Sequence, residues 1–150
     1  MSDWRAKALE LFPDMQAEIH AADSLGEFWI ELSARFRSFY TAQSDSQSAQ
    51  SPQFMRAICL YAIWCTRSDS VDIQGPAWIE FYENLPRFAL QSNPSIYKRI
   101  VDDLVSNLGI AEMEKQSSTI GAFMTPDENK KFFTDVSVAE AERQKRSRKR

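Results

Sequence analysis

Residues that could perform acid–base or nucleophilic chemistry are few in this 150-residue chain. The one histidine, His20, and a cysteine, Cys65, form the only Cys–His candidate for a nucleophile and its base. No catalytic motif surrounds either residue, and the second cysteine, Cys59, gives no CxxC or metal-ligand spacing. We therefore interpret the cysteines as buried core thiols and His20 as a surface or helix-end residue.

Two carboxylate pairs are candidates for acid–base or metal sites. Glu80 and Glu83 are three residues apart and could share one ion or one proton on a helix face. Asp102 and Asp103 are adjacent, so on a helix their side chains point about 100° apart. Nothing supplies further ligands, which favours solvated helix faces. We predict no catalytic residue, no metal, no cofactor and no enzymatic activity, and an enzyme of unrecognised type is the alternative left open.

Acidic residues are concentrated near the N-terminus, where residues 1–31 contain seven acids and two basic residues. Within two pairs, Asp14 with Glu18 and Glu27 with Glu31, a spacing of four puts both carboxylates on one helix face. An ordinary solvated surface is one interpretation. A docking surface for a basic protein partner is the other, since complementary charge speeds association and rejects wrong partners. We predict that the partner-binding residues are Asp14, Glu18, Asp23, Glu27 and Glu31.

The elements that must position these acids are helical. Residues 24–42 are predicted to form a helix, opened by a capping box of Ser24 and Glu27. Apolar residues recur there at the spacing of one buried helical stripe: Leu25, Phe28, Trp29, Leu32, Phe36, Phe39 and Tyr40.

Further start and stop signals recur along the chain. Helices are predicted to begin at Pro52, Pro76 and Pro94, and Pro86 is predicted to end the second of these. Residues 41–51 are polar and aperiodic, which predicts a loop. Two more capping boxes are predicted, each a hydroxyl residue followed three positions later by glutamate: Thr125 with Glu128 and Ser137 with Glu140.

Strand-like alternation is missing from the sequence, and 43% of the residues are hydrophobic. These features predict an all-α fold, a single-domain multi-helix bundle or orthogonal stack of about six helices. We expect residues 1–116 to form the helical domain, residues 117–142 a loosely attached helical segment, and residues 143–150 a flexible basic tail.

Charge is segregated along the chain. The protein has a net charge of −3, yet six of its last eight residues are basic, so residues 1–142 carry 12 basic and 21 acidic residues, a net −9. The tail could bind nucleic acid or a membrane surface, fold back on the acidic body, act as a targeting signal, or stay solvated. Phosphate binding by about six charges would be weak and salt-sensitive. We therefore disfavour a nucleic-acid partner and predict no membrane partner.

The N-terminus carries charges where a secretory signal would need an apolar run. No stretch approaches the roughly 20 apolar residues that span a bilayer. We expect a cytoplasmic protein.

Four short stretches carry a resemblance to a known group of proteins: LFPDM at 11–15, SLGEFWIEL at 24–32, YAIWC at 61–65 and FYENLP at 81–86. Together they resemble a family of small, uncharacterised bacterial helical proteins over roughly residues 9–90. Such proteins are similar in size and character to the immunity proteins encoded beside polymorphic toxins. The resemblance implies a bacterial binding protein and supplies no catalytic role.

The sequence leaves three functions open for this protein. The first is an immunity or antitoxin-like protein that occludes a toxin or effector through its acidic surface. The second is a non-catalytic adaptor or regulatory subunit of a larger assembly, with the basic tail as docking segment. The third is a nucleic-acid-associated protein that acts through the tail.

Overall fold

The protein is all-α, as predicted. The computed structural model describes residues 4–41 and 51–149, with residues 51 and 52 described only in their backbone, and contains no strand within these ranges. The chain divides into two compact units, unit 1 (Met1–Phe81) and unit 2 (Tyr82–Arg150). Most of the loop predicted at 41–51 lies outside the described residues. The arrangement as one bundle or stack of about six helices stays a prediction.

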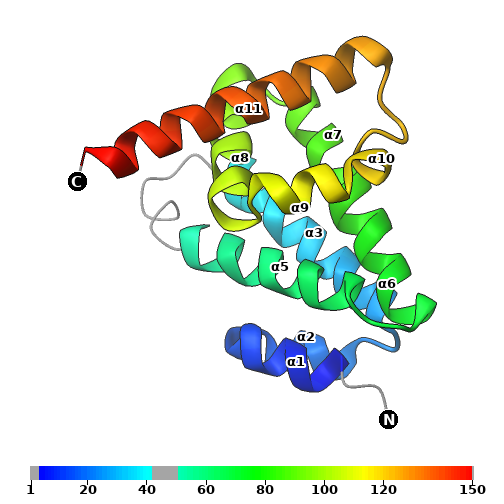
Figure 1. Ribbon diagram of the computed structural model, residues 1–150. Coiled ribbons are helices and arrows are strands. Elements are labelled where there is room, and N and C mark those ends of the chain that lie inside the picture. Colours follow the sequence, from blue (N-terminus) through cyan, green and yellow to red (C-terminus); the bar gives the residue numbers. More distant parts are fainter. Residues whose placement is uncertain (1–3, 42–50, 150) are drawn as a thin grey trace. The chain divides into compact units, whose positions relative to one another are not determined.

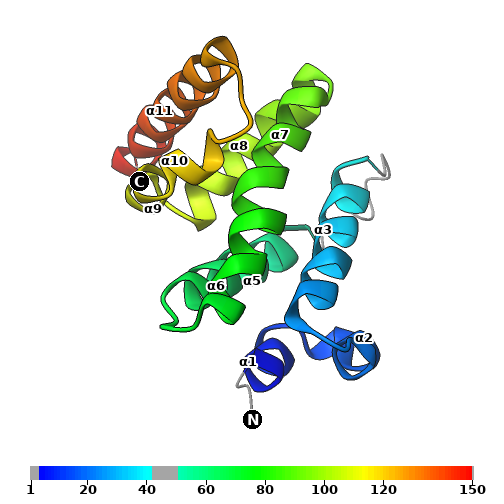
Figure 2. The same ribbon diagram turned by 90° about the vertical axis from the view of Figure 1, so that its right-hand side faces the viewer.

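Unit 1 contains the predicted acidic residues and is built from short helices around two longer ones (Figures 1 and 2). Its elements are α1 (Trp4–Leu11), the 3₁₀ turn η1 (Pro13–Met15), α2 (Gln16–Ala21), α3 (Leu25–Thr41), α5 (Ser51–Thr66), α6 (Val71–Ala77) and most of the π-helix η2 (Trp78–Glu83). The helix predicted over residues 24–42 is present as α3.

The core of unit 1 is aromatic and centres on Tyr61 of α5. Its ring lies 5.4 Å from the ring of Trp29 and 5.6 Å from that of Phe12, measured between centroids. The Tyr61 hydroxyl donates a 2.9 Å hydrogen bond to the backbone carbonyl of Trp4. This bond satisfies a polar group that burial would otherwise penalise, and it ties α1 to α5.

The helix boundaries predicted at two prolines are wrong. Helix α6 begins at Val71 and contains Pro76, and Pro86 lies in the first turn of α7 (Asn84–Gln91). Glu83, the residue before α7, itself has helical φ and ψ, so Pro86 lies inside a continuous helical segment and does not end it. Pro76 offers no N–H to the carbonyl four residues before it, and the chain takes π geometry directly after α6. Residues 71–91 therefore form one helical path with a change of pitch.

Unit 2 is an all-helical unit in which α11 packs across α8 (Figure 1). Its helices are α7, α8 (Pro94–Asn107), α9 (Ile110–Lys115), α10 (Ser117–Ile120) and α11 (Pro126–Arg148). Its buried apolar side chains include Ile100, Leu104, Met113, Ile120, Phe132 and Val136. Gly109, between α8 and α9, has a φ of 90°, a backbone conformation that favours glycine.

Helix α11 carries the predicted C-terminal segments. The capping box of Thr125 and Glu128 is confirmed, with reciprocal hydrogen bonds of 2.9 and 3.1 Å. The box predicted at Ser137 is wrong, because Ser137 lies inside α11 and its hydroxyl donates to the carbonyl of Phe133.

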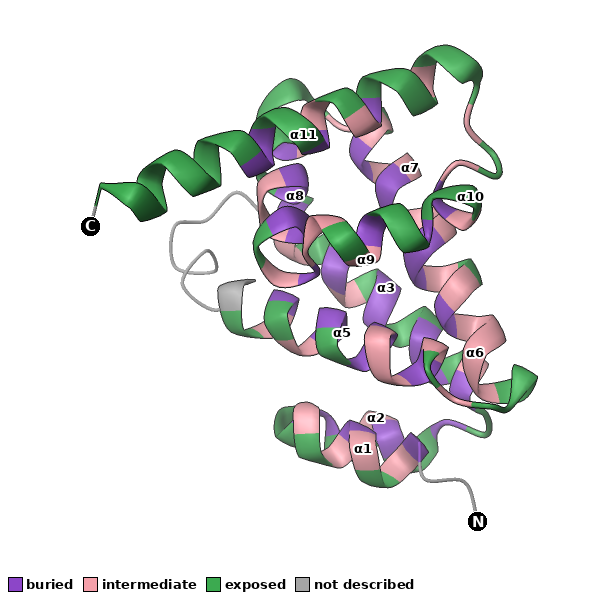
Figure 3. Ribbon diagram, in the orientation of Figure 1, coloured by how far each residue is buried: buried purple, intermediate pink, exposed green. Residues whose placement is uncertain are grey.

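The structure also differs from the predicted division of the chain. Its unit boundary follows Phe81, whereas the predicted domain boundary follows residue 116. The residues predicted as a loosely attached segment, 117–142, contribute Phe132 and Val136 to the buried core. The basic residues from 143 onward continue the helix as far as Arg148, and residues 141–149 are exposed (Figure 3). Their flexibility stays a prediction.

Candidate protein-binding surface

Helix α3 of unit 1 has a buried face and an exposed face. The buried face consists of Leu25, Phe28, Trp29, Leu32, Ser33, Phe36 and Tyr40. Glu27, Ile30 and Glu31 are spaced three and four residues apart, so they share the opposite face, and all three are exposed. Core packing of one stripe therefore aims these three side chains at solvent.

Three of the five predicted partner-binding residues line one surface pocket of about 350 Å³. Glu18 comes from α2, and Glu27 and Glu31 come from α3, with Ile30 between them. The Glu18 carboxylate is paired with the Arg35 guanidinium at 3.4 Å. The structure thus brings together acids that lie up to 13 positions apart in the sequence.

Glu27 also has a structural role at the start of α3. Its carboxylate accepts a 2.8 Å hydrogen bond from the backbone N–H of Asp23, and its own N–H donates to the Ser24 hydroxyl at 3.2 Å. The predicted cap is therefore present, with Asp23 in place of Ser24 as the backbone donor. A charge reversal at Glu27 would disturb the helix start as well as the surface.

The other two predicted residues lie outside this pocket. Asp14, on η1, is exposed and lines a different pocket together with Arg35 and Phe39. Asp23 is exposed in the α2–α3 connection. The two units differ in net charge: unit 1 has 11 acidic and 6 basic residues (net −5), whereas unit 2 has 10 and 12 (net +2).

Sequence reasoning missed the apolar part of this surface. Ile30 is 57% exposed, Val71 72% and Ile79 52%. These three side chains line a second pocket, of about 320 Å³, between α3, α6 and η2. One signal was available: Ile30 does not belong to the apolar stripe of α3.

The residues weighed for catalysis do not form a reactive site in the described part of the chain. Both cysteines are buried and neither is in a disulfide, and burial raises the pKa of the Cys65 thiol to about 12. A protonated thiol is a poor nucleophile at neutral pH. His20 is exposed on α2. Within residues 4–41 and 51–149, no group of three or more His, Cys, Asp or Glu side chains is placed to hold a metal ion.

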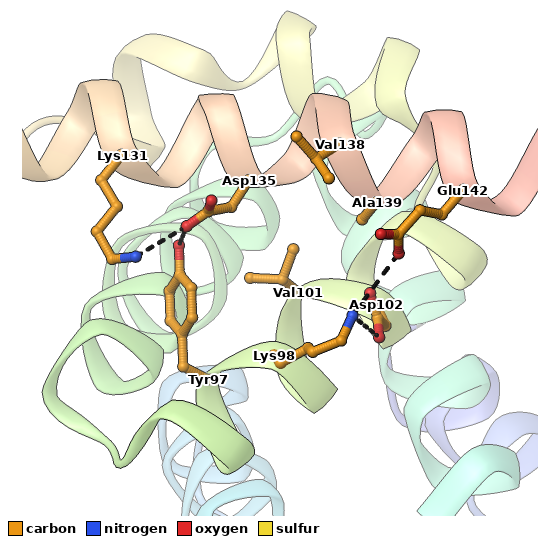
Figure 4. A pocket seen from close by; sticks show the side chains of 9 residues that line it. All are labelled: Tyr97, Lys98, Val101, Asp102, Lys131, Asp135, Val138, Ala139 and Glu142. Atoms are coloured by element: carbon orange, nitrogen blue, oxygen red, sulfur yellow. Dashed lines mark hydrogen bonds and ion pairs between the residues drawn. The ribbon is translucent and has the colours of Figure 1, made fainter.

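A smaller pocket of about 230 Å³ lies between α8 and α11 of unit 2 (Figure 4). On one side the Tyr97 hydroxyl donates a 2.6 Å hydrogen bond to Asp135, and the Lys131 ammonium lies 3.0 Å from the same carboxylate. On the other side Lys98 is paired with Asp102 at 3.2 Å and with Glu142 at 3.7 Å. Asp102, considered earlier with Asp103, is thus part of an ion-pair network.

The pKa values follow from these contacts. Partial burial raises the pKa of Tyr97, and its hydrogen bond to Asp135 raises it further. Partial burial of Asp135 opposes ionisation, but the hydrogen bonds from Tyr97 and Lys131 lower its pKa overall. Every charged side chain lining this pocket lies against an opposite charge, with Lys98 shared by Asp102 and Glu142, so the arrangement mainly joins two helices.

No helix in the described ranges is long and apolar enough to cross a membrane. No protein-family model, curated protein or solved structure matches this chain.

Proposed function

We propose that this chain is an immunity or antitoxin-like protein that binds a toxin or effector through the acidic surface of unit 1. The partner is a protein with a basic surface, and binding occludes that partner's active site. The proposal includes a bacterial source and a cytoplasmic location, both of which rest on the sequence. Its action requires no catalytic residue, metal or cofactor of its own.

The observation that supports this proposal most directly is the common pocket of Glu18, Glu27 and Glu31. Carboxylates from two helices converge there beside an exposed isoleucine, in a unit whose net charge is −5. Close acidic groups raise the local negative potential, which attracts a basic partner and repels acidic competitors. Glu18 and Glu27 also have structural roles, as the ion-pair partner of Arg35 and as the acceptor for the Asp23 N–H, so Glu31 is the carboxylate most available to a partner.

The first experiment identifies the partner and measures occlusion. The tagged full-length chain is used to capture proteins from a lysate of its source organism, with a salt series and mass spectrometry. A captured toxin or effector is then purified and assayed with increasing amounts of this chain. We expect inhibition to be complete at one chain per partner, and a partner whose activity is unchanged when saturated would contradict occlusion.

Charge-reversal variants test the surface. Asp14→Lys with Glu31→Lys changes two predicted contacts whose carboxylates have no ion-pair or hydrogen-bond partner among the described residues. Asp69→Lys with Glu114→Lys is a matched control, since both residues are exposed and line none of the three pockets described in unit 1. We expect the first double variant to bind at least tenfold more weakly, mainly through slower association, and the control to bind normally. Equal loss in both double variants would contradict this placement.

A non-catalytic adaptor or regulatory subunit is the second candidate. It is favoured by the exposed end of α11, where Arg143, Lys145, Arg146, Arg148 and Lys149 follow one another within seven residues. An adaptor that docks through this segment would lose its assembly when the segment is removed, whereas an occluding inhibitor would keep its partner.

A further inference from the structure

Exposed apolar side chains are concentrated on unit 1 beside the acidic pocket. Six large hydrophobic side chains in the described ranges are exposed. Three of them, Ile30, Val71 and Ile79, line one pocket, which lies between α3, α6 and η2. Isolated exposed hydrophobics are ordinary, but a cluster rimmed by polar groups is typical of interaction sites. Binding of a basic partner by the acidic residues alone would not account for the exposure of these apolar side chains.

The apolar and acidic pockets are neighbours that share a lining residue. Ile30 lines both of them, with Glu27 and Glu31 on the acidic side and Asp72 and Glu80 on the apolar side. Neither pocket is lined by a lysine or arginine among the described residues. The surface is therefore an apolar centre with a rim of one sign of charge.

This pattern restricts the chemistry of the occupant. An anionic lipid surface and a nucleic-acid backbone are both repelled by the acidic rim. An acidic protein segment is repelled in the same way. A basic segment without large apolar side chains would leave the exposed Ile30, Val71 and Ile79 uncovered. An occupant that matches both the apolar centre and the acidic rim carries a large apolar side chain with neighbouring lysines or arginines.

We propose that this surface receives an amphipathic basic segment of the protein partner. One large aliphatic or aromatic side chain enters the pocket of Ile30, Val71 and Ile79, and basic residues next to it face Glu31 and Asp72. Such an anchor in a pocket surrounded by charge has the anatomy of a binding hot spot. The inference rests on the proposed function and adds the class of segment that the partner presents.

Defined peptides test this inference without knowledge of the natural partner. The probe is a fluorescently labelled 18-residue peptide of lysine and leucine, with leucine on one helical stripe. One control peptide replaces each leucine with alanine, and another replaces each lysine with glutamate. Binding to the full-length chain is measured by fluorescence anisotropy. We expect the lysine–leucine peptide to bind at least tenfold more tightly than either control.

Matched variants locate the contact. Ile30→Ala with Ile79→Ala removes exposed side chains, so the fold should persist, as checked by circular dichroism. Leu60→Ala is the control because Leu60 is also exposed, at 42%, but lies on α5 and lines neither pocket. We expect the double variant to raise the Kd of the lysine–leucine peptide at least tenfold and Leu60→Ala to change it less than twofold.

The outcomes separate this inference from the function on which it rests. If Glu31→Lys weakens peptide binding but the isoleucine double variant does not, the apolar anchor is overturned and the acidic surface stands. If Glu31→Lys has no effect and the glutamate–leucine peptide binds equally well, the acidic surface is overturned, and this inference with it. Failure of the lysine–leucine peptide to bind at all also overturns the inference.

Discussion

The hydroxyl of Ser33 donates a 2.8 Å hydrogen bond to the backbone carbonyl of Glu80, 47 residues away. Ser33 is a buried residue on α3, and Glu80 lies in the π-helix η2. The bond therefore connects the two elements that contribute Ile30 and Ile79 to the apolar pocket. A polar residue on the buried face of α3 is explained by this contact.

Ser33→Ala should lower the free energy of unfolding by about 1–3 kcal/mol, because it removes a hydrogen bond to a carbonyl in a partly buried setting. Ser38→Ala on the exposed face of the same helix is the control and should change it by less than about 0.5 kcal/mol. Urea unfolding followed by circular dichroism measures both. Equal free energies of unfolding of the two variants would show that the hydrogen bond from Ser33 to the Glu80 carbonyl does not contribute measurably to stability.

Glu27→Lys and Glu31→Lys should differ in stability although both reverse an acid on the same face of α3. Glu27→Lys removes the acceptor for the Asp23 N–H and puts a cation in the first helical turn, which should cost about 1 kcal/mol. Glu31 makes no such bond within the described ranges. Thermal unfolding should show a lower Tm for Glu27→Lys alone. Partner-binding results with Glu27 variants therefore need this stability correction, whereas those with Glu31 do not.

Tyr97→Phe should destabilise unit 2 in a pH-dependent manner. The pKa of Asp135 is lowered from its ordinary value of 3.8, so the ionised carboxylate contributes stability above that pH, which is lost as the pH falls through the lowered pKa. At pH 7 the variant should lose about 1 kcal/mol, since a hydrogen bond to a charged group is removed from a partly exposed site. The loss should shrink toward pH 2.

The matching control is Tyr97→Phe introduced into Asp135→Asn, measured by urea unfolding across the same pH range. The pH dependence of the tyrosine effect should vanish in this background. A loss of equal size at pH 7 and pH 2 would show that Tyr97 acts through packing of its ring alone.

Removal of residues 145–150 should leave the fold intact and separate the two candidate functions. This cut retains Arg143 and Gln144, which donate to the Glu140 carboxylate at 2.8–3.0 Å. The deleted side chains of residues 145–149 are exposed, so Tm should change by no more than a few degrees. An occluding inhibitor should keep its affinity for the partner. Lost affinity in a folded truncation would instead favour the adaptor.

The local sequence was sufficient for much of the helical structure. The apolar stripe of α3 and the capping box of Thr125 and Glu128 depend on residues three or four apart, so the helical period predicts them without knowledge of the fold. The same pattern failed at Ser137, which lies inside α11. The boundaries at Pro76 and Pro86 could not be predicted in this way. Local preference there favours a helix start or stop, but the folded chain continues through η2, where Ser33, distant in sequence, bonds the Glu80 carbonyl.

The candidate surface also depends partly on local sequence and partly on long-range packing. The sequence by itself determined that the N-terminal region is acidic and that Glu27 and Glu31 share a face, because charge and helical spacing are local properties. Only the tertiary structure decided that Glu18 joins them and that Ile30, Val71 and Ile79 meet in one pocket. Packing of α2 and α6 against α3 brings these residues together, and that packing depends on contacts between residues far apart in the chain.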